Sequence, residues 1–390
     1  MSDTQKHKKL NVPNLRFPGF EGEWERMKAS DLLEFFSTNS LSWEQLEFGG
    51  TGLLNLHYGL IHNGLPSQID INNSSLPAIK AGNEPRKNTL CKEGDIAFAD
   101  ASEDTNDVGK VVEFVDCAGK NVVCGLHTIH GRDKLDITVP GFKGYAFSSR
   151  AFHDQIKRIA QGTKVFSISV GSFDEVCVGI PSKEEQKRIA GLLSLIDQRI
   201  AIQNKIIERY ESLIKALAYE TIGKYTPNTM LSECVLCSSS TLKESDLEEA
   251  GAVPAYGAAG ISGFTDSAIS NGDSILITKD GSGIGSLRYV SGPHSFVGTL
   301  NSMTPKDGVY LPYIYYALQN VCFETYRTGQ AIPHIYFRDY GKEAIYCPAF
   351  DDQKRLAKWL ELIDAKIKIE RAVLRNLQSA KASLLTGMFI

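Results

Sequence analysis

The stretch PSKEEQKRIAGLLSLIDQRIAI, residues 181–202, returns 167 positions later as PAFDDQKRLAKWLELIDAKIKI, residues 348–369. Of these 22 aligned positions 11 are identical, and the alignment needs no gap. A repeat of this length indicates a repeated structural unit rather than a short motif. The chain is therefore predicted to contain two similar halves related by an internal pseudo-two-fold.

Each copy of the repeat opens a long helix with an apolar seam. Steps of alternately three and four residues meet apolar or aromatic side chains at seven of eight positions in the first copy and six of eight in the second. The fourth of these positions is polar in both copies, Gln203 in the first and Glu370 in the second, and we call it the polar break. The shared pattern predicts a coiled-coil seam. The seam positions are Leu193, Ile196, Ile200, Gln203, Ile207, Tyr210, Ile214 and Leu217, matched by Leu360, Ile363, Ile367, Glu370, Leu374, Leu377, Lys381 and Leu384.

Each predicted helix is about 57 Å long, from roughly 38 residues at 1.5 Å per residue. A lone surface helix of that length is unusual in a globular domain. We expect the two helices to pack on each other, because each follows a similar globular region. The alternative is a coiled coil that joins separate copies of the chain.

The repeat divides the chain into four segments. Globular domains are predicted over residues 1–180 and 224–347, and spacer helices over 181–223 and 348–390. The globular segments read as mixed α/β (α+β), since short apolar runs alternate with helical patterns. Strands are expected at 95–99, 110–115, 121–123, 274–278, 287–290 and 294–297, and helices at 149–160 and 312–326.

Composition narrows the functional classes. The 390 residues are 42% hydrophobic, enough for ordinary cores, and the net charge is −4. The eight cysteines are scattered, as in a reduced compartment. Residues 1–20 have no apolar core of a secretory signal, and no run approaches the ~20 residues of a membrane span. A cytoplasmic location without membrane contact is expected.

The sequence shows no catalytic site. The N/D-P-P-Y/F tetrapeptide of an adenine methyltransferase is missing. The glycine-rich segment 280–285 precedes a strand-like run rather than a helix, so a hairpin turn is expected instead of a phosphate-binding loop. Cys234 with Cys237, and Cys124 with His127 and His130, have only part of a zinc pattern, and no metal is predicted.

The order of globular domain and helix, repeated twice, resembles the DNA-specificity subunit of type I restriction–modification enzymes. So do the recurring opening P-x-x-x-(E/D)-Q-K-R-(I/L)-A-x-x-L-x-x-I-D, the N-terminal segment 13–25, and the segment 329–339, which looks like the end of a target-recognition domain. The matching segment 162–168 lacks the Pro-His pair, so its closing loop is expected to differ in shape.

The resemblance implies two target-recognition domains and two helices that pair antiparallel. Each domain would read one half of a bipartite site in double-stranded DNA. The helices would set the gap and dock two methyltransferase (modification) subunits, to which restriction or motor subunits are added. The chain itself would be non-catalytic, and S-adenosylmethionine, ATP and Mg would belong to the partner subunits.

Two groups of side chains are the candidates for these contacts. DNA contacts are predicted for polar and basic residues near the ends of the globular domains: Arg150, Lys157, Arg158, Lys164, Lys279, Ser282, Arg288, Arg327, Gln330, His334 and Arg338. Roles in the spacer or in partner binding are predicted for Gln186, Lys187, Arg188, Leu193, Ile196, Ile200, Gln353, Lys354, Arg355, Leu360, Ile363 and Ile367. The alternative function is a coiled-coil scaffold that binds proteins without DNA specificity.

Overall fold

The computed structural model describes residues 10–72, 74–117, 119–330 and 332–390. Residues 1–9, which belong to the segment searched for a secretory signal, and Ala331 of the closing motif lie outside this description. The chain forms two compact units, one made of the residues up to Ile202 with Leu374–Ile390, the other of Gln203–Val373. Both units are mixed α/β, as predicted.

A five-stranded mixed sheet, in the order β2-β11-β7-β9-β5, is the main sheet of the first unit. A four-stranded sheet, β10-β4-β6-β3, and two small pairs, β1-β13 and β12-β8, complete it. The strands are β1 (Glu25–Lys28), β2 (Leu33–Phe36), β3 (Leu46–Glu47), β4 (Leu54–Leu56), β5 (Gln68–Asp70), β6 (Ala78–Ile79), β7 (Ile96–Ala99), β8 (Ala101–Ser102), β9 (Val111–Asp116), β10 (Val122–Cys124), β11 (Thr128–Asp133), β12 (Phe166–Ser167) and β13 (Cys177–Ile180).

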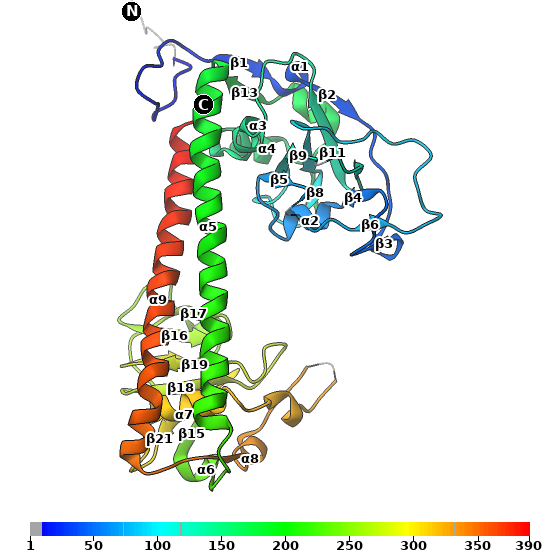
Figure 1. The fold of residues 1–390 in the computed structure, drawn as a ribbon. Helices are drawn as coiled ribbons and strands as arrows, with labels where there is room; N and C mark the ends of the chain where they lie inside the picture. Colours follow the sequence, from blue (N-terminus) through cyan, green and yellow to red (C-terminus); the bar gives the residue numbers. More distant parts are fainter. Residues whose placement is uncertain (1–9, 73, 118, 331) are drawn as a thin grey trace, which may run out of the picture. The chain divides into compact units, whose positions relative to one another are not determined.

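Helices α3 (Phe142–Ser148) and α4 (Arg150–Ile159) lie between this sheet and the first part of α5 (Lys183–Ala218) (Figure 1). Their buried aromatic residues, among them Phe147 and Phe152, form one core with Phe98 of β7 and Leu193 of α5. Burial of several such side chains gives about 1.5–3 kcal/mol each. The remaining helical segments are α1 (Ala29–Leu32), η1 (Trp43–Gln45), α2 (Tyr58–His62) and η2 (Val170–Asp174).

A four-stranded antiparallel sheet, β15-β21-β18-β19, is the main sheet of the second unit. It is accompanied by the three-stranded sheet β17-β16-β20 and the pair β14-β22. The strands are β14 (Thr229–Met230), β15 (Val235–Ser239), β16 (Val253–Gly257), β17 (Gly260–Thr265), β18 (Ser274–Thr278), β19 (Leu287–Val290), β20 (Ser295–Phe296), β21 (Leu300–Pro305) and β22 (Ala344–Ile345).

The helical segments of this unit include one departure from prediction. The expected helix at 312–326 is divided into α7 (Leu311–Leu318) and a 3-10 turn, η5 (Phe323–Tyr326), because the backbone tightens into turns after α7, where the Asn320 and Val321 N–H groups donate to the carbonyls three residues earlier. The other segments are η3 (Tyr219–Gly223), a π-helical turn that continues α5, then α6 (Leu231–Cys234), η4 (Glu244–Asp246), α8 (Phe337–Tyr340) and α9 (Phe350–Gly387).

Both long helices are continuous, α5 over 36 residues and α9 over 38 (Figure 1). In the first unit, Asp197 near the beginning of α5 pairs with Lys381 near the end of α9 at 2.6 Å. In the second unit, Tyr225 just after α5 stacks on Tyr346 just before α9. Within each unit the two helices therefore run antiparallel, as expected.

The predicted seam is found on both helices. All sixteen seam side chains are buried or half-buried, and the intervening positions are mostly exposed. At the polar break the Gln203 amide donates to the backbone carbonyl of Glu370 at 3.1 Å and to the Glu370 carboxylate. The two polar residues therefore satisfy one another inside an apolar contact. The internal pseudo-two-fold and the four segment boundaries stay predictions.

The glutamine of the QKR opening joins each helix to its own globular part. The Gln186 side chain is fully buried, accepts from the Val139 N–H at 2.9 Å, and donates to the Pro181 carbonyl at 2.9 Å. Gln353, which is 2% exposed, accepts from the Tyr310 N–H and donates to the Pro348 carbonyl, both at 2.8 Å. Buried in this way, neither glutamine is available to a partner surface.

Removal of this anchor tests its contribution. Gln186→Ala leaves a buried N–H and a buried carbonyl without their partner, so we expect the free energy of unfolding to fall by roughly 2–3 kcal/mol. Gln198→Ala, an exposed glutamine on the same helix, should change it by less than about 0.5 kcal/mol. Denaturant unfolding of the purified chain measures both values, and equal effects would show that the buried hydrogen bonds contribute nothing specific.

Candidate nucleic-acid interface

Two reciprocal backbone hydrogen bonds close a loop at the end of the first globular part. Gln161 and Ser167 each donate their N–H to the carbonyl of the other, at 3.0 and 2.8 Å. Inside the loop Gly162 has a φ of 139°, and a Cβ there would overlap the Val165 carbonyl oxygen. Only glycine allows this tight approach. The Ile168 N–H then donates to the Asp100 carbonyl, just beyond β7.

The second unit closes in the same way, 167 positions later. Thr328 and His334 exchange N–H to carbonyl hydrogen bonds at 2.8 Å, and the Ile335 N–H donates to the Lys279 carbonyl just beyond β18. Gly329 has a φ of 80°, and its Cβ would lie 2.6 Å from the Ile332 carbonyl oxygen. The frame of the two closing loops is therefore shared, whereas the different φ values at the two glycines give the loops different courses.

A histidine bound to a carboxylate lies beside each closing loop. In the second unit His334 Nδ1 is 2.6 Å from Asp280 Oδ1, so both partners belong to the predicted region. In the first unit the pair is His127 Nδ1 and Asp100 Oδ1, at 3.0 Å. This pair is not predicted from the sequence, because no motif in the sequence connects Asp100 with His127. The feature that distinguishes His127 is its backbone conformation in the structure. Its φ is 53°, which is rare for a residue other than glycine.

A cleft of about 420 Å³ brings together several predicted residues of the second unit. The cleft lies between the β18–β19 hairpin and the closing loop. These two segments are joined by a hydrogen bond from the Gly281 N–H to the Pro333 carbonyl, at 2.9 Å. The β18–β19 pairing confirms the predicted hairpin at 280–285. The lining residues are Gly281, Ser282, Ile284, Glu324, Arg327, Gln330, Ile332 and Pro333.

Charges in and near this cleft are partly balanced. Arg327 pairs with Glu324 at 2.6 Å, and Lys279 lies 3.8 Å from Asp280. The Arg327 pair is exposed and the Lys279 pair is half-buried, and ion pairs open to solvent contribute little to stability, so these cations can be redirected to a phosphate at small cost. The carboxylates can themselves accept a hydrogen bond from a base amino group.

Arg338 extends this surface. Its side chain is 78% exposed, and its guanidinium lies 4.8 Å from the centre of the Tyr336 ring, which stacks near His334. An arginine held flat over an aromatic ring is a usual geometry for stacking and for bidentate hydrogen bonding. Arg288 is exposed on β19 beside the β16–β17 turn at Gly260 and does not line the cleft.

The structure divides the predicted cations of the first unit between α4 and the closing loop. Arg150 and Lys157 line a cleft of about 540 Å³, and Arg158 lines a second cleft of about 410 Å³ together with Arg150. Arg150 lies 3.5 Å from Asp154, and Lys157 donates to Asn106 at 2.6 Å. Lys164 is exposed on the closing loop and lines neither of these clefts.

Aromatic side chains form a second unpredicted feature of the first unit. Trp43, which is 42% exposed, lies 4.3 Å from the ring centre of His57, and Tyr58 contacts both His57 and His127. Burial, and next the neighbouring His127, lower the pKa of His57, so this imidazole is neutral in the stack at neutral pH. An exposed aromatic ring at this place is a suitable stacking surface for a base.

The repeated Lys-Arg pairs at the helix starts point outward. Lys187, Arg188, Lys354 and Arg355 are all exposed. Arg188 lies over the Phe20 ring and Lys354 over the Phe350 ring, at 5.8 and 4.3 Å from the ring centres. The seam residues Leu193, Ile196, Ile200, Leu360, Ile363 and Ile367 face inward and serve the helix contact.

The predicted cysteine patterns are arranged differently from the sequence spacing. Cys234 hydrogen-bonds to Cys347, whereas Cys237 faces the Tyr340 hydroxyl at 3.9 Å, so the two do not act as a pair. Cys124 and His130 do come together, but His127 turns away to Asp100. Among the described residues no helix is both long and apolar enough to cross a membrane.

Comparisons with known proteins agree on one family. Residues 235–379 match the model of the type I restriction modification DNA specificity domain. A protein of Mycoplasma pneumoniae, provisionally named as a type I specificity subunit, is 26% identical over 314 residues, covering 72% of this chain and 81% of its own length. The chain is therefore similar to type I specificity subunits.

Two solved structures have the same fold as this chain. The crystal structure of a type I restriction–modification S subunit from M. genitalium superposes with a TM-score of 0.60 at 20% identity, covering 97% of this chain and 99% of that one. A chain from a structural study of complex assembly in a type I system superposes with a TM-score of 0.53 at 14% identity, covering 96% and 98%.

The backbone hydrogen bonds shared by the two closing loops predict that Gly162 cannot be replaced without opening its loop. Gly162→Ala should open the closing loop, because a Cβ cannot be placed beside the Val165 carbonyl. We expect faster amide hydrogen exchange at residues 161–168 and a loss of about 1–3 kcal/mol in unfolding free energy. Gly171→Ala, where a Cβ has room, is the control. Unchanged exchange in the Gly162 variant would contradict the assignment of the loop.

Proposed function

We propose that this chain is the non-catalytic DNA-recognition subunit of a type I restriction–modification complex, and that each globular part reads one half of a bipartite site. One observation carries the proposal. The two closing loops have the same hydrogen-bonded frame at an offset of 167, and each lies beside a carboxylate-bound histidine. The side chains around the two frames differ, which is what two different half-sites require.

The mildly acidic chain is compatible with this role because recognition depends on local groups. In the second unit Arg327, Gln330 and Ser282 line one cleft, and Arg338 lies nearby on α8. Arginine and glutamine read base edges in the major groove, while lysine, arginine and serine hold phosphates. In the first unit we assign the equivalent role to Lys164, with Arg150, Lys157 and Arg158 as backbone contacts.

The paired helices are proposed to set the distance between half-sites. An uninterrupted α-helix of 36 residues spans about 54 Å, and half-sites on one face of DNA lie about 34 Å apart. Each helix is fixed to its globular part by a buried glutamine, so a change in helix length would be transmitted to the reading surface rather than absorbed at a flexible joint.

Repeated exposed apolar residues are the proposed docking positions for two modification subunits. Leu195 is 64% exposed and Ile202 49%, and their equivalents Leu362 and Ile369 are 55% and 58% exposed. Single exposed apolar side chains are common, but here they recur at the same repeat positions of both helices, which is the feature that favours a repeated contact. The exposed Lys187, Arg188, Lys354 and Arg355 would border these contacts.

The partners would supply the chemistry. Base methylation requires extrusion of the target base into a pocket, and we assign that pocket, with S-adenosylmethionine, to the modification subunits. ATP and Mg would belong to the restriction subunits. The complex would act on DNA in the cytoplasm. A protein scaffold without DNA specificity is the alternative that the next experiment separates.

A test of half-site reading uses Arg327→Ala with Arg338→Ala in the complex with modification subunits. Loss of a base or phosphate contact costs about 1–3 kcal/mol, so we expect roughly 10- to 100-fold weaker DNA binding. Sequencing of methylated sites in cells should show relaxed recognition in one half of the site only. Lys224→Ala, an exposed cation paired to Glu220 in the same unit, should leave both readouts unchanged.

Two outcomes would contradict the proposal. If relaxed recognition spread over both halves, the globular parts would not read DNA separately. If the assembled complex showed no site-selective DNA binding at all, the scaffold alternative would replace the proposed function.

A test of docking uses Leu195→Glu and Leu362→Glu. A charge in place of a leucine that becomes buried should weaken each contact at least about 10-fold, from the 1.5–3 kcal/mol of its burial. We expect complexes with one modification subunit for each single variant and none for the double variant, measured by light scattering after size exclusion. Gln198→Glu, exposed on the same helix, is the control. Normal assembly of the double variant would exclude this surface.

A further inference from the structure

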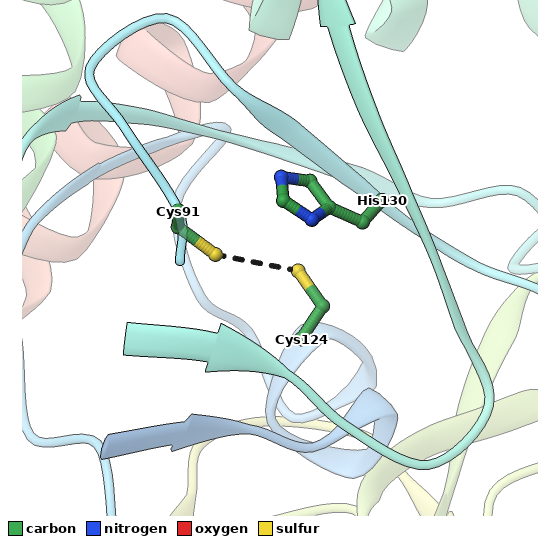
Figure 2. Close-up of side chains that lie close together, drawn as sticks. All are labelled: Cys91, Cys124 and His130. Atoms are coloured by element: carbon green, nitrogen blue, oxygen red, sulfur yellow. Dashed lines mark hydrogen bonds between the residues drawn. The ribbon is translucent and has the colours of Figure 1, made fainter. Parts of the chain in front are cut away.

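Three side chains that could bind a metal meet inside the first unit. Cys91, Cys124 and His130 are all buried, and their ligand atoms lie within 4.8 Å of one another. Figure 2 shows both sulfurs and a nitrogen of the His130 ring turned toward a common point. No other part of the proposed function uses this cluster.

The local fold brings the three residues together from separate segments. Cys124 is the last residue of β10, and His130 lies within β11. Cys91 is held beside β10 by its N–H, which donates to the Val122 carbonyl at 2.8 Å, next to the Leu90–Val123 bridge. β10 belongs to the four-stranded sheet and β11 to the five-stranded sheet, so the cluster lies where the two sheets of this unit meet.

The sulfur separation fits a shared metal ion. Cys91 Sγ and Cys124 Sγ are 3.6 Å apart. A tetrahedral zinc ion with Zn–S bonds of about 2.3 Å holds two sulfurs about 3.8 Å apart. A disulfide would require about 2.05 Å. The pair therefore has the spacing of two ligands of one ion, without movement of the backbone.

His130 has the arrangement of a metal-bound imidazole. Its Nε2 lies 2.8 Å from Asp95 Oδ2, and its Nδ1 is buried with no hydrogen-bond partner among the described atoms. Metal-ligating histidines usually donate the other ring N–H to a carboxylate, which fixes the tautomer and the ring orientation. With Nε2–H donating to Asp95, the free lone pair is on Nδ1, facing the sulfurs.

The surrounding charges also balance. Arg132 donates two hydrogen bonds of 2.7 Å to Asp95, one to each carboxylate oxygen. Two thiolates and the Asp95 carboxylate would be neutralised by one divalent cation and the Arg132 guanidinium. A buried set of charges is tolerated when it is paired in this way.

We propose that Cys91, Cys124 and His130 Nδ1 bind a structural zinc ion that joins the two sheets of the first unit. Thiolate and imidazole ligands favour zinc over the hard cations Mg²⁺ and Ca²⁺. The proposal replaces the prediction that the chain holds no metal, and it does not depend on the proposed function.

The ion would also fix a surface loop. Residues 125–127 connect Cys124 to β11, and this loop carries His127, which pairs with Asp100 beside the closing loop. With both ends of the loop held within a few residues of a metal ligand, the position of His127 would depend on the ion. Metal removal is therefore expected to increase hydrogen exchange at 125–130 more than at residues of the second unit.

The test measures metal content and ligand type in the full-length chain. Mass spectrometry of metals should find about one zinc per chain, and Co²⁺ added after chelation should give the visible absorption of a tetrahedral site with thiolate-to-cobalt charge transfer. Cys91→Ser, Cys124→Ser and His130→Ala should each lower bound zinc at least tenfold. Cys322→Ser, an exposed cysteine in the second unit, should retain it.

The zinc measurement and the Co²⁺ addition on the unaltered chain test the proposed metal site even if a variant fails to fold. Absence of both zinc and the cobalt charge-transfer band would overturn the proposal. So would a Cys91–Cys124 disulfide found by mass spectrometry of the chain purified without reductant, since thiols joined in this way cannot both bind an ion.

Discussion

The buried side chains of Gln186 and Gln353 fix the first turn of each long helix to the globular part that precedes it. Each amide satisfies a backbone N–H and a backbone carbonyl that would otherwise be left unpaired inside the protein. Because these groups are buried, the alternative to the hydrogen bond is not water but an unsatisfied polar group. Each buried glutamine therefore helps to fix the direction in which its helix leaves the globular part, together with the apolar packing of the same helix turns.

The contact between α5 and α9 combines apolar packing with a buried polar hydrogen bond. Apolar seam residues provide most of the stabilisation, and Gln203 with Glu370 places one polar contact among them. A polar pair inside an apolar seam lowers stability but selects one register, because a slip would separate the buried Gln203 amide from Glu370. The proposed role of the helices, to measure the distance between half-sites, needs a single register more than it needs the greatest stability.

In the first unit, the hydrogen bonds of Asp95 influence the geometry of a larger region. Asp95 receives hydrogen bonds from His130 and Arg132, which orients the imidazole toward Cys91 and Cys124. The loop that follows Cys124 carries His127, so the core of this unit and the surface next to its closing loop are linked through a few residues. In the second unit the corresponding histidine, His334, lies in the closing loop itself and binds Asp280 directly. The two units therefore reach a similar arrangement by different routes.

The sequence alone determined the two long helices, their seam and the glycine-rich hairpin, because periodicity and glycine placement act between residues close in the chain. It also identified Arg327, Gln330 and Ser282, which the structure brings into one cleft. The tertiary structure alone decided which cations converge, since Arg288 and Lys164 lie apart from the clefts that their neighbours line. It also divided the helix expected at 312–326, where Asn320 contacts Ala218, and brought Cys91 to Cys124 and His130. These contacts join residues tens of positions apart, and one sequence contains no local pattern that reports them.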